Sequence, residues 1–382
     1  MNKIENILKI KEYDKFKCIA DKCNFTCCTG WDINVDTKTY NKWRENKDLK
    51  YLLDNVRFIK GHGKNKFLIK KETNGVCPFL SNEGLCNIVT DHGDEYLSLT
   101  CRSFPRIEND FEDVKELTLS CSCPEVVNII SHMEEKIYIE SNNSLSYIED
   151  LGCLKIRESL VNILQKEDIR IENKLILSYD MLFNMLDNDD LTYENLIEFL
   201  DNYKSKNYIK EELNKYKDYE NKDTIEYLKE VNSLFIDIIE NYRNVPSFKE
   251  ALKDIYKFTE EINIEKFVKN WKEFKDLFKE YDNLIENCIV SKVLSSCVSD
   301  DLEEMIISFE MIILEYLLIR HAVFLRYYIN IKKEISIQDV KDYIVIFSRI
   351  IGNNSEAVIE FLLDMYESEI LEFDYICSLI LI

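Results

Sequence analysis

The cysteines of this chain are concentrated in its first third, and they constrain its fold more than any other residue type. Nine of the thirteen lie before residue 125, together with three of the four prolines and six of the eight glycines. This composition is typical of loops and short elements. We therefore expect a small N-terminal region of short strands and helices, whose core is too small to be stable without an additional cross-link such as a metal or a disulfide.

The setting of these cysteines favours metal binding over disulfides. The first residues carry charge at every second or third position, which excludes a secretory signal and predicts a cytoplasmic protein, where disulfides are rare. Nine thiols within 106 residues are more than an intracellular core normally uses. The candidate metal ligands are Cys18, Cys23, Cys27, Cys28, Cys77, Cys86, Cys101, Cys121 and Cys123.

The spacing of the thiols favours an iron–sulfur cluster, with zinc as the alternative. Structural zinc usually takes Cys-x-x-Cys pairs, and the chain contains none. Thiols that arrive from scattered loops suit an iron–sulfur cluster better. Cys123 precedes Pro124, so we expect it to cap a helix whose free amides favour the thiolate.

From residue 145 onward the sequence is helical almost throughout. Runs such as "LIENCIVSKVL" repeat apolar residues at spacings of three and four, and only Gly152, Pro246 and Gly352 interrupt the pattern. We expect eight to ten helices, with capping boxes that begin at Ser247 and Ser336. The long apolar run from Met305 carries charges, which predicts a helix buried in protein, not a membrane span.

The fold class is therefore mainly α. We expect a cysteine-rich metal-cluster domain at residues 1–140, with a strand at "KFLIK" and another at "VKELTLS", and an all-α domain at residues 141–382. We expect the boundary near residues 125 to 145, with "ESNNSLSYIEDLG", residues 140–152, as the linker.

The charge of the chain argues against a nucleic-acid partner. Residues 1–130 hold 20 basic and 20 acidic side chains, so the whole net charge of −22 lies in the remainder. Nucleic acids are bound mainly through Lys and Arg that neutralise phosphates. An acidic field attracts a basic substrate instead, such as an exposed lysine on another protein, although it also serves solubility.

The cysteine blocks are similar to those of a known family. "FKCIADKCNFTCCTGWDINVDTKTYNKW", "CPFLSNEGLC", "LSLTCRSFPR" and "LTLSCSCPEVV" resemble, in their order and flanking residues, the blocks of the flagellin lysine-N-methylase family. The resemblance of the helical half rests on weaker patterns, such as "FSRIIGNNSEAV".

This resemblance implies transfer of methyl groups from S-adenosylmethionine to lysine side chains of flagellin, with an iron–sulfur cluster. The implied ligands come from the nine cysteines named above, and Cys121 is an extra thiol beside Cys123, so either could be the ligand. Trp31, Arg102 and Arg106 are the candidate cofactor-binding residues. Trp31 either covers the cluster or fills the core, and the arginines either hold an anionic group or form ordinary ion pairs.

No catalytic base can be singled out from the sequence. Methyl transfer to lysine needs a neutral amine, whose ordinary pKa is about 10.4, in line with the sulfonium carbon. The chain offers 22 tyrosines and many carboxylates for this proton transfer. Two other functions stay open: a metal-binding or electron-transfer module without methyltransferase activity, and a helical interaction protein stapled by zinc.

Overall fold

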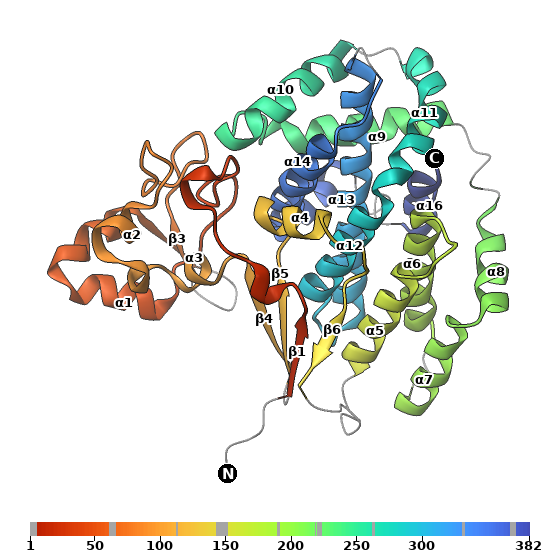
Figure 1. Cartoon of the computed structure of the whole chain (residues 1–382), viewed down its shortest axis with the longest axis horizontal. Helices are drawn as coiled ribbons and strands as arrows, with labels where there is room; N and C mark the ends of the chain where they lie inside the picture. Colours follow the sequence, from red (N-terminus) through yellow and green to blue (C-terminus); the bar gives the residue numbers. More distant parts are fainter. Residues whose placement is uncertain are drawn as a thin grey trace.

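The computed structural model describes residues 6–60, 66–111, 114–142, 152–188, 192–217, 219, 224–261, 264–330, 333–366 and 372–382. Figure 1 shows a mainly helical molecule, with the cysteine-rich segments at one side, the sheet next to them, and the long helices beyond the sheet. The fold class expected from the sequence is therefore confirmed. The expected linker falls largely on residues 143–151, which lie outside the described residues.

The N-terminal region contains short elements in two sheets. Strands β4, β5, β1 and β6 form a sheet in that order, in which β1 is parallel to β5 and the other neighbours are antiparallel. Strands β2 and β3 pair separately. The elements are β1 (Asn6–Ile10), α1 (Thr37–Glu45), β2 (Val56–Ile59), β3 (Lys66–Ile69), α2 (Asn87–His92), α3 (Leu99–Ser103), β4 (Arg106–Phe111), β5 (Val114–Leu119), α4 (Pro124–Ser131) and β6 (Ile139–Ser141).

Local sequence signals account for several of these boundaries. Asp36 caps α1 by accepting a hydrogen bond from the amide of Thr39 at 2.9 Å. The same carboxylate accepts from the amide of Leu99, at the start of α3. Cys123 is the N-cap of α4, and Pro124 takes the first helical position, as the sequence predicted.

The rest of the chain is helical. Twelve α-helices follow residue 150 in the described ranges, more than the eight to ten expected. They are α5 (Gly152–Leu164), α6 (Ile171–Leu186), α7 (Tyr193–Asn202), α8 (Lys206–Lys215), α9 (Thr224–Glu240), α10 (Pro246–Glu261), α11 (Ile264–Phe278), α12 (Asp282–Ser296), α13 (Leu302–Ile329), α14 (Ile337–Phe347), α15 (Ser355–Tyr366) and α16 (Phe373–Leu381).

Helix α13 is the buried axis of this assembly. It contains the apolar run from Met305, and the residues from Phe309 to Leu325 are all buried. A search of the described residues finds no helix with the length and apolarity that a membrane span requires. Of the two expected capping boxes, Ser336 caps α14, whereas α10 already begins at Pro246, so Ser247 lies in its first turn.

The buried side chains form two separate clusters. The small cluster, which includes Trp43, Ile69 and Phe79, lies under α1, α2 and the β2–β3 pair. The large cluster joins the four-stranded sheet, for example through Ile10 and Leu119, to the helices. The sheet is therefore packed against the helical core, and a domain boundary near residue 140 stays a prediction.

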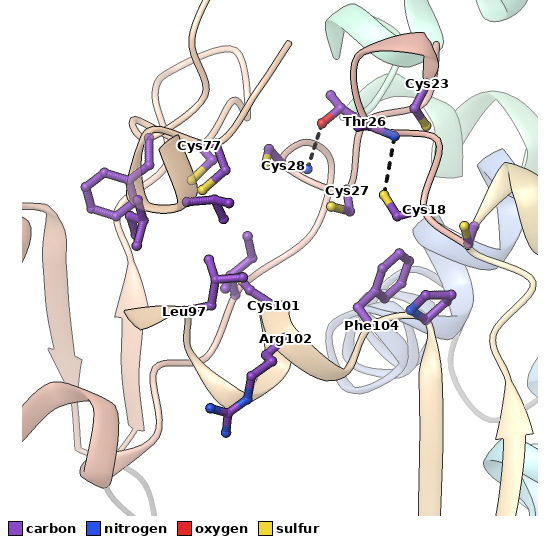
Figure 2. A pocket seen from close by; sticks show the side chains of 18 of the residues that line it. Cys18, Cys23, Thr26, Cys27, Cys28, Cys77, Leu97, Cys101, Arg102 and Phe104 are labelled. Atoms are coloured by element: carbon purple, nitrogen blue, oxygen red, sulfur yellow. Dashed lines mark hydrogen bonds between the residues drawn. The ribbon is translucent and has the colours of Figure 1, made fainter. Parts of the chain in front are cut away.

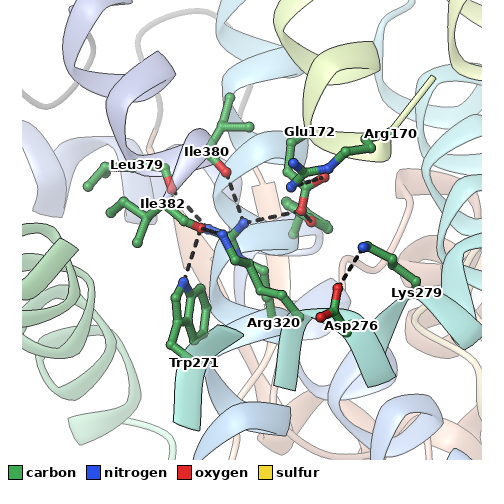
Figure 3. A network of polar contacts seen from close by, with 11 residues as sticks. Arg170, Glu172, Trp271, Asp276, Lys279, Arg320, Leu379, Ile380 and Ile382 are labelled. Carbon is green, nitrogen blue, oxygen red and sulfur yellow. Dashed lines mark hydrogen bonds and ion pairs between the residues drawn. The ribbon is translucent and has the colours of Figure 1, made fainter. Parts of the chain in front are cut away.

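Polar contacts anchor α16 within the bundle. Arg320 of α13 donates hydrogen bonds to the carbonyls of Leu379 and Ile380, both at 2.9 Å, and Trp271 of α11 donates to the carbonyl of Ile382 (Figure 3). Arg320 also lies 3.6 Å from the carboxylate of Glu172 in α6. The last carbonyls of α16, which lack partners within the helix, are thus satisfied by side chains of two other helices.

Glu310 provides a test of the helical core. Its carboxyl accepts one hydrogen bond, from the hydroxyl of Tyr179 at 2.5 Å, and its other oxygen has no hydrogen-bond partner among the described residues. Burial raises the pKa of Glu310 to about 7. An unfolded glutamate titrates near 4.3, so the folded state binds more protons between these values and its stability falls as the pH rises.

We expect Glu310→Gln to stabilise the protein more at pH 8 than at pH 5, because the amide accepts the Tyr179 hydrogen bond without a buried charge. The gain in unfolding free energy at pH 8 should be about 1–3 kcal/mol, measured by chemical denaturation at both values. Glu303→Gln, at an exposed position of the same helix, is the control. Equal effects of Glu310→Gln at both pH values would contradict this prediction.

Candidate functional site

Eight of the nine candidate cysteines line a single cavity of about 620 Å³. Figure 2 shows thiols from the loop before α1 facing those of the segments around α2 and α3 across this space. The lining thiols are Cys18, Cys23, Cys27, Cys28, Cys77, Cys86, Cys101 and Cys123. Residues that are more than 100 positions apart in the sequence thus converge on one site.

Short backbone contacts hold the thiol-bearing segments together. The amide of Cys77 donates to the carbonyl of Cys28 at 2.8 Å, and the amide of Gly30 donates to the carbonyl of Gly75. Cys86 and Cys123 are the N-caps of α2 and α4, so their thiols lie beside free backbone amides. The positions of the thiols are therefore fixed largely by backbone geometry.

The thiols of Cys27 and Cys28 interact with each other, and each also approaches a different neighbour. Cys28 contacts the thiol of Cys77, whereas Cys27 lies nearer to Cys18 and Cys23 (Figure 2).

Burial raises the pKa of Cys101 to about 11 and that of Cys123 to about 12. Without a bound cation these thiols are neutral at pH 7, and ligation of a metal requires the loss of their protons.

The donor set determines which metal group the cavity suits. In the part of the chain that is described, no three or more His, Cys, Asp or Glu side chains are arranged to hold a single metal ion. The thiols instead surround a space of about 620 Å³. Thiols are the usual ligands of iron–sulfur clusters, which are larger than one ion, so the residues present fit such a group.

Cys121 is separated from this site. Its thiol lies in the helical core, 3.8 Å from the carbonyl of Cys288, and does not line the cavity. The neighbouring Cys123 does line the cavity. The sequence left open which of the two is a ligand, and the geometry favours Cys123.

The three candidate cofactor-binding residues also line the cavity. The indole of Trp31 donates to the carbonyl of Cys27 at 2.8 Å, and its ring centre lies 5.4 Å from that of Phe104. Arg106 donates to the carbonyl of Phe16 at 3.1 Å and lies over its ring. These two side chains therefore help to form the walls of the cavity.

Arg102 differs from the other two candidates. Its side chain is exposed at the cavity, and no hydrogen bond or ion pair joins it to the other described residues. The ordinary ion pair that the sequence left as an alternative is therefore not found among the described residues. In Figure 2 the guanidinium of Arg102 points away from the labelled thiols.

The helical region supplies part of the site, which sequence analysis missed. Arg349, in a π-helical turn at Ser348–Gly352, lines the cavity and donates to the carbonyls of Thr26 and Ser122, both at 2.8 Å. The only available signal was an arginine in the apolar run "IVIFSRII", where charge is normally excluded.

The thiol loop is also packed against α10. Gly30 has φ +83°, and a Cβ atom on it would lie 2.7 Å from the ring of Phe248. The hydroxyls of Thr29 and Ser247 are hydrogen-bonded at 2.7 Å. A glycine is required at position 30 both by the backbone conformation and by this close approach.

A second hollow, of about 630 Å³, adjoins the cavity, because Phe25 and Pro124 line both. Its other walls include the carboxylates of Glu125, Glu250 and Asp342 and the amines of Lys22 and Lys341. Burial raises the pKa of Asp342. The cavity is thus bordered by a hollow that carries charges of both signs, with three carboxylates and two amines.

Fold and site together define a mainly helical protein with a cavity lined by eight thiols. The sequence profile of the FliB lysine N-methylase C-terminal domain matches residues 157–379, more than half of the chain. The chain therefore belongs to the FliB lysine N-methylase family.

Curated relatives agree with this assignment. Flagellar biosynthetic protein FliU of Salmonella muenchen is 31% identical over 135 residues, which are 34% of this chain and 80% of that protein. Lysine-N-methylases of Salmonella typhimurium LT2 and Salmonella choleraesuis SC-B67 are 32% and 33% identical over 120 and 119 residues. Each of these two alignments covers 30% of the chain and 30% of the relative. No solved structure matches the chain.

Two glycines in the loops that carry the thiols, Gly30 and Gly84, provide a matched test of how the first thiol loop is held. Gly84 has φ +79°, but a Cβ atom there would meet nothing within 4 Å. Gly84→Ala should lower the unfolding free energy by about 1–2 kcal/mol through backbone strain alone. Gly30→Ala should lower it by a further 1–3 kcal/mol or so, because the ring of Phe248 must move. Chemical denaturation of both variants measures the difference, and equal losses would refute the packing argument.

Proposed function

We propose that this protein transfers methyl groups from S-adenosylmethionine to lysine side chains of flagellin, and that its cavity holds an iron–sulfur cluster. The observation that carries the proposal is the convergence of eight thiols on one cavity in a member of the FliB lysine N-methylase family. The name of the relative FliU, a flagellar biosynthetic protein, supports a flagellar substrate.

The cysteines that line the cavity would hold the cluster, and Cys121 would not. When bound, the cluster would supply a redox-active and Lewis-acidic metal centre beside the methyl donor. The thiols must be reduced to serve as ligands, which is consistent with a cytoplasmic location.

Arg102 and Trp31 suit the two ends of the methyl donor. S-adenosylmethionine carries a carboxylate, which a guanidinium can bind through two parallel hydrogen bonds, and Arg102 has its donors free among the described residues. Its sulfonium is a cation, and the faces of Trp31 and Phe104 attract cations. We place the donor along this wall of the cavity.

The cavity walls would also prepare the lysine for attack. An ammonium group would first meet the carboxylates of Glu125, Glu250 and Asp342 in the adjoining hollow. Beyond Phe25 and Pro124 the side chain enters the cavity, where aromatic walls such as Phe16 and Phe79 desolvate it. Desolvation lowers the pKa of an amine, so the neutral nucleophile becomes accessible near pH 7.

The proposal is tested with protein purified without oxygen. We expect iron and sulfide in the wild-type protein, and mass increments of whole methyl groups on flagellin lysines when S-adenosylmethionine is added. Cys101→Ser should lose both the cluster and the activity, because it removes a ligand from the cavity wall. Cys297→Ala, in the helical core, is the control and should keep both. Zinc without iron would favour a structural staple, and a cluster without methyl transfer would favour an electron-transfer module.

Arg102 offers a separate prediction on the cofactor. Loss of a charge-assisted hydrogen bond costs about 1.5–3 kcal/mol, so Arg102→Ala should raise the KM for S-adenosylmethionine roughly 10- to 100-fold. Iron content and thermal stability should not change, because this side chain has no partner within the described residues. Arg57→Ala, a surface arginine paired with Asp32 outside the cavity, is the control. An unchanged KM would exclude Arg102 from the binding site.

A further inference from the structure

We propose that Arg349 is a positioning residue of the metal site, contributed by the helical region: its guanidinium fixes two thiol-bearing loops and its charge balances metal-bound thiolates. This inference depends on one part of the proposed function, namely that the thiols ligate a metal. It concerns a residue outside the cysteine-rich region.

The hydrogen bonds of Arg349 join two distant loops. Its Nη1 and Nη2 donate to the carbonyls of Thr26 and Phe25, which lie between Cys23 and Cys27. Its Nε donates to the carbonyl of Ser122, directly before Cys123. One planar group therefore sets the distance between the first thiol loop and the start of α4, which a shorter or flexible side chain could not do.

The charge of Arg349 is not balanced by any carboxylate in the described part of the chain. The side chain is fully buried, and no ion pair joins it to an Asp or Glu of the described residues. A fully buried charge is normally paired, because its desolvation is otherwise unfavourable by several kcal/mol. The other two buried arginines follow this rule, since Arg157 pairs with Glu116 at 2.5 Å and Arg320 lies 3.6 Å from the carboxylate of Glu172.

Thiols are the groups that surround Arg349 on the cavity side. Its charge interacts with Cys27, Cys23, Cys123 and Cys28. Neutral thiols would leave the guanidinium uncompensated, whereas metal-bound thiolates supply the missing negative charge. The buried arginine is thus explained if these thiols are ligands, and it would partly offset the charge of the cluster.

The turn that carries Arg349 is itself held in place. Ser122 donates through its hydroxyl to the carbonyl of Ser348 at 3.1 Å and to the side chain of Asn353 at 3.0 Å. Asn354 donates to the carbonyl of Arg349 at 2.8 Å. π-Helical turns are rare and frequently occur at functional sites. Here the turn directs a long side chain out of the helical core and into the cavity.

The experiment compares Arg349→Met and Arg349→Lys with Arg157→Met after anaerobic reconstitution of the full chain. The readouts are iron and sulfide per chain, the midpoint potential of the cluster, and circular dichroism as a check of folding. Arg157→Met removes a buried arginine of similar size away from the thiols, so it controls for general destabilisation.

We expect Arg349→Met to bind at most half of the wild-type iron, and its remaining cluster to have a lower midpoint potential, because a nearby positive charge favours the reduced state. Arg349→Lys should keep a potential close to that of the wild type, since the charge remains, but should bind less iron. Arg157→Met should keep the wild-type potential.

Three outcomes would overturn the inference. Wild-type iron and potential in folded Arg349→Met would show that the site does not need this residue, while leaving the proposed function intact. If Arg349→Met does not fold, a wild-type iron content in Arg349→Lys decides against positioning by the guanidinium. A wild-type protein that binds neither iron nor zinc overturns the metal site and this inference together.

Discussion

The contact between the thiol loop and the helical bundle is the interaction on which the site depends. Arg349 holds the carbonyls of the loop, the hydroxyls of Thr29 and Ser247 are hydrogen-bonded, and Gly30 lies directly against Phe248. These contacts join residues separated by more than 200 positions. The cysteine-rich segments thus form one face of the cavity, and the bundle supplies the group that fixes their spacing.

This arrangement combines features that are individually unfavourable. Thiols such as Cys101 and Cys123 lie where desolvation disfavours their ionised forms, and the guanidinium of Arg349 is buried without a carboxylate partner among the described residues. Each feature alone would reduce stability, because buried charge and buried polar groups need partners. Under the proposed function, ligation of a metal makes both features favourable at once, since the thiolates bind the metal and balance the charge of Arg349. Binding of the metal would then stabilise the whole contact between loop and bundle.

Much of the fold and part of the site could be predicted from the sequence. Local signals were sufficient for the cap at Cys123 and for the strand at "KFLIK", because each depends on neighbours in the chain. The cysteine blocks indicated the site, and the profile match confirmed the family. The roles of Arg349 and the separation of Cys121 from Cys123 could not be predicted, because tertiary packing decides which buried side chain faces the cavity.

The order in which the chain is synthesised has a consequence for this site. Thr26 and Arg349 are 323 positions apart, so at 5–20 residues per second the first thiols leave the ribosome roughly tens of seconds before the arginine that holds their loop. Strand β1 likewise lies between β5 and β6 in the sheet, and both of these partners are made about a hundred residues later. The reactive thiols of the nascent N-terminal segment therefore stay unprotected until their partners have been synthesised. A metal that binds before the bundle has folded would find an incomplete set of contacts.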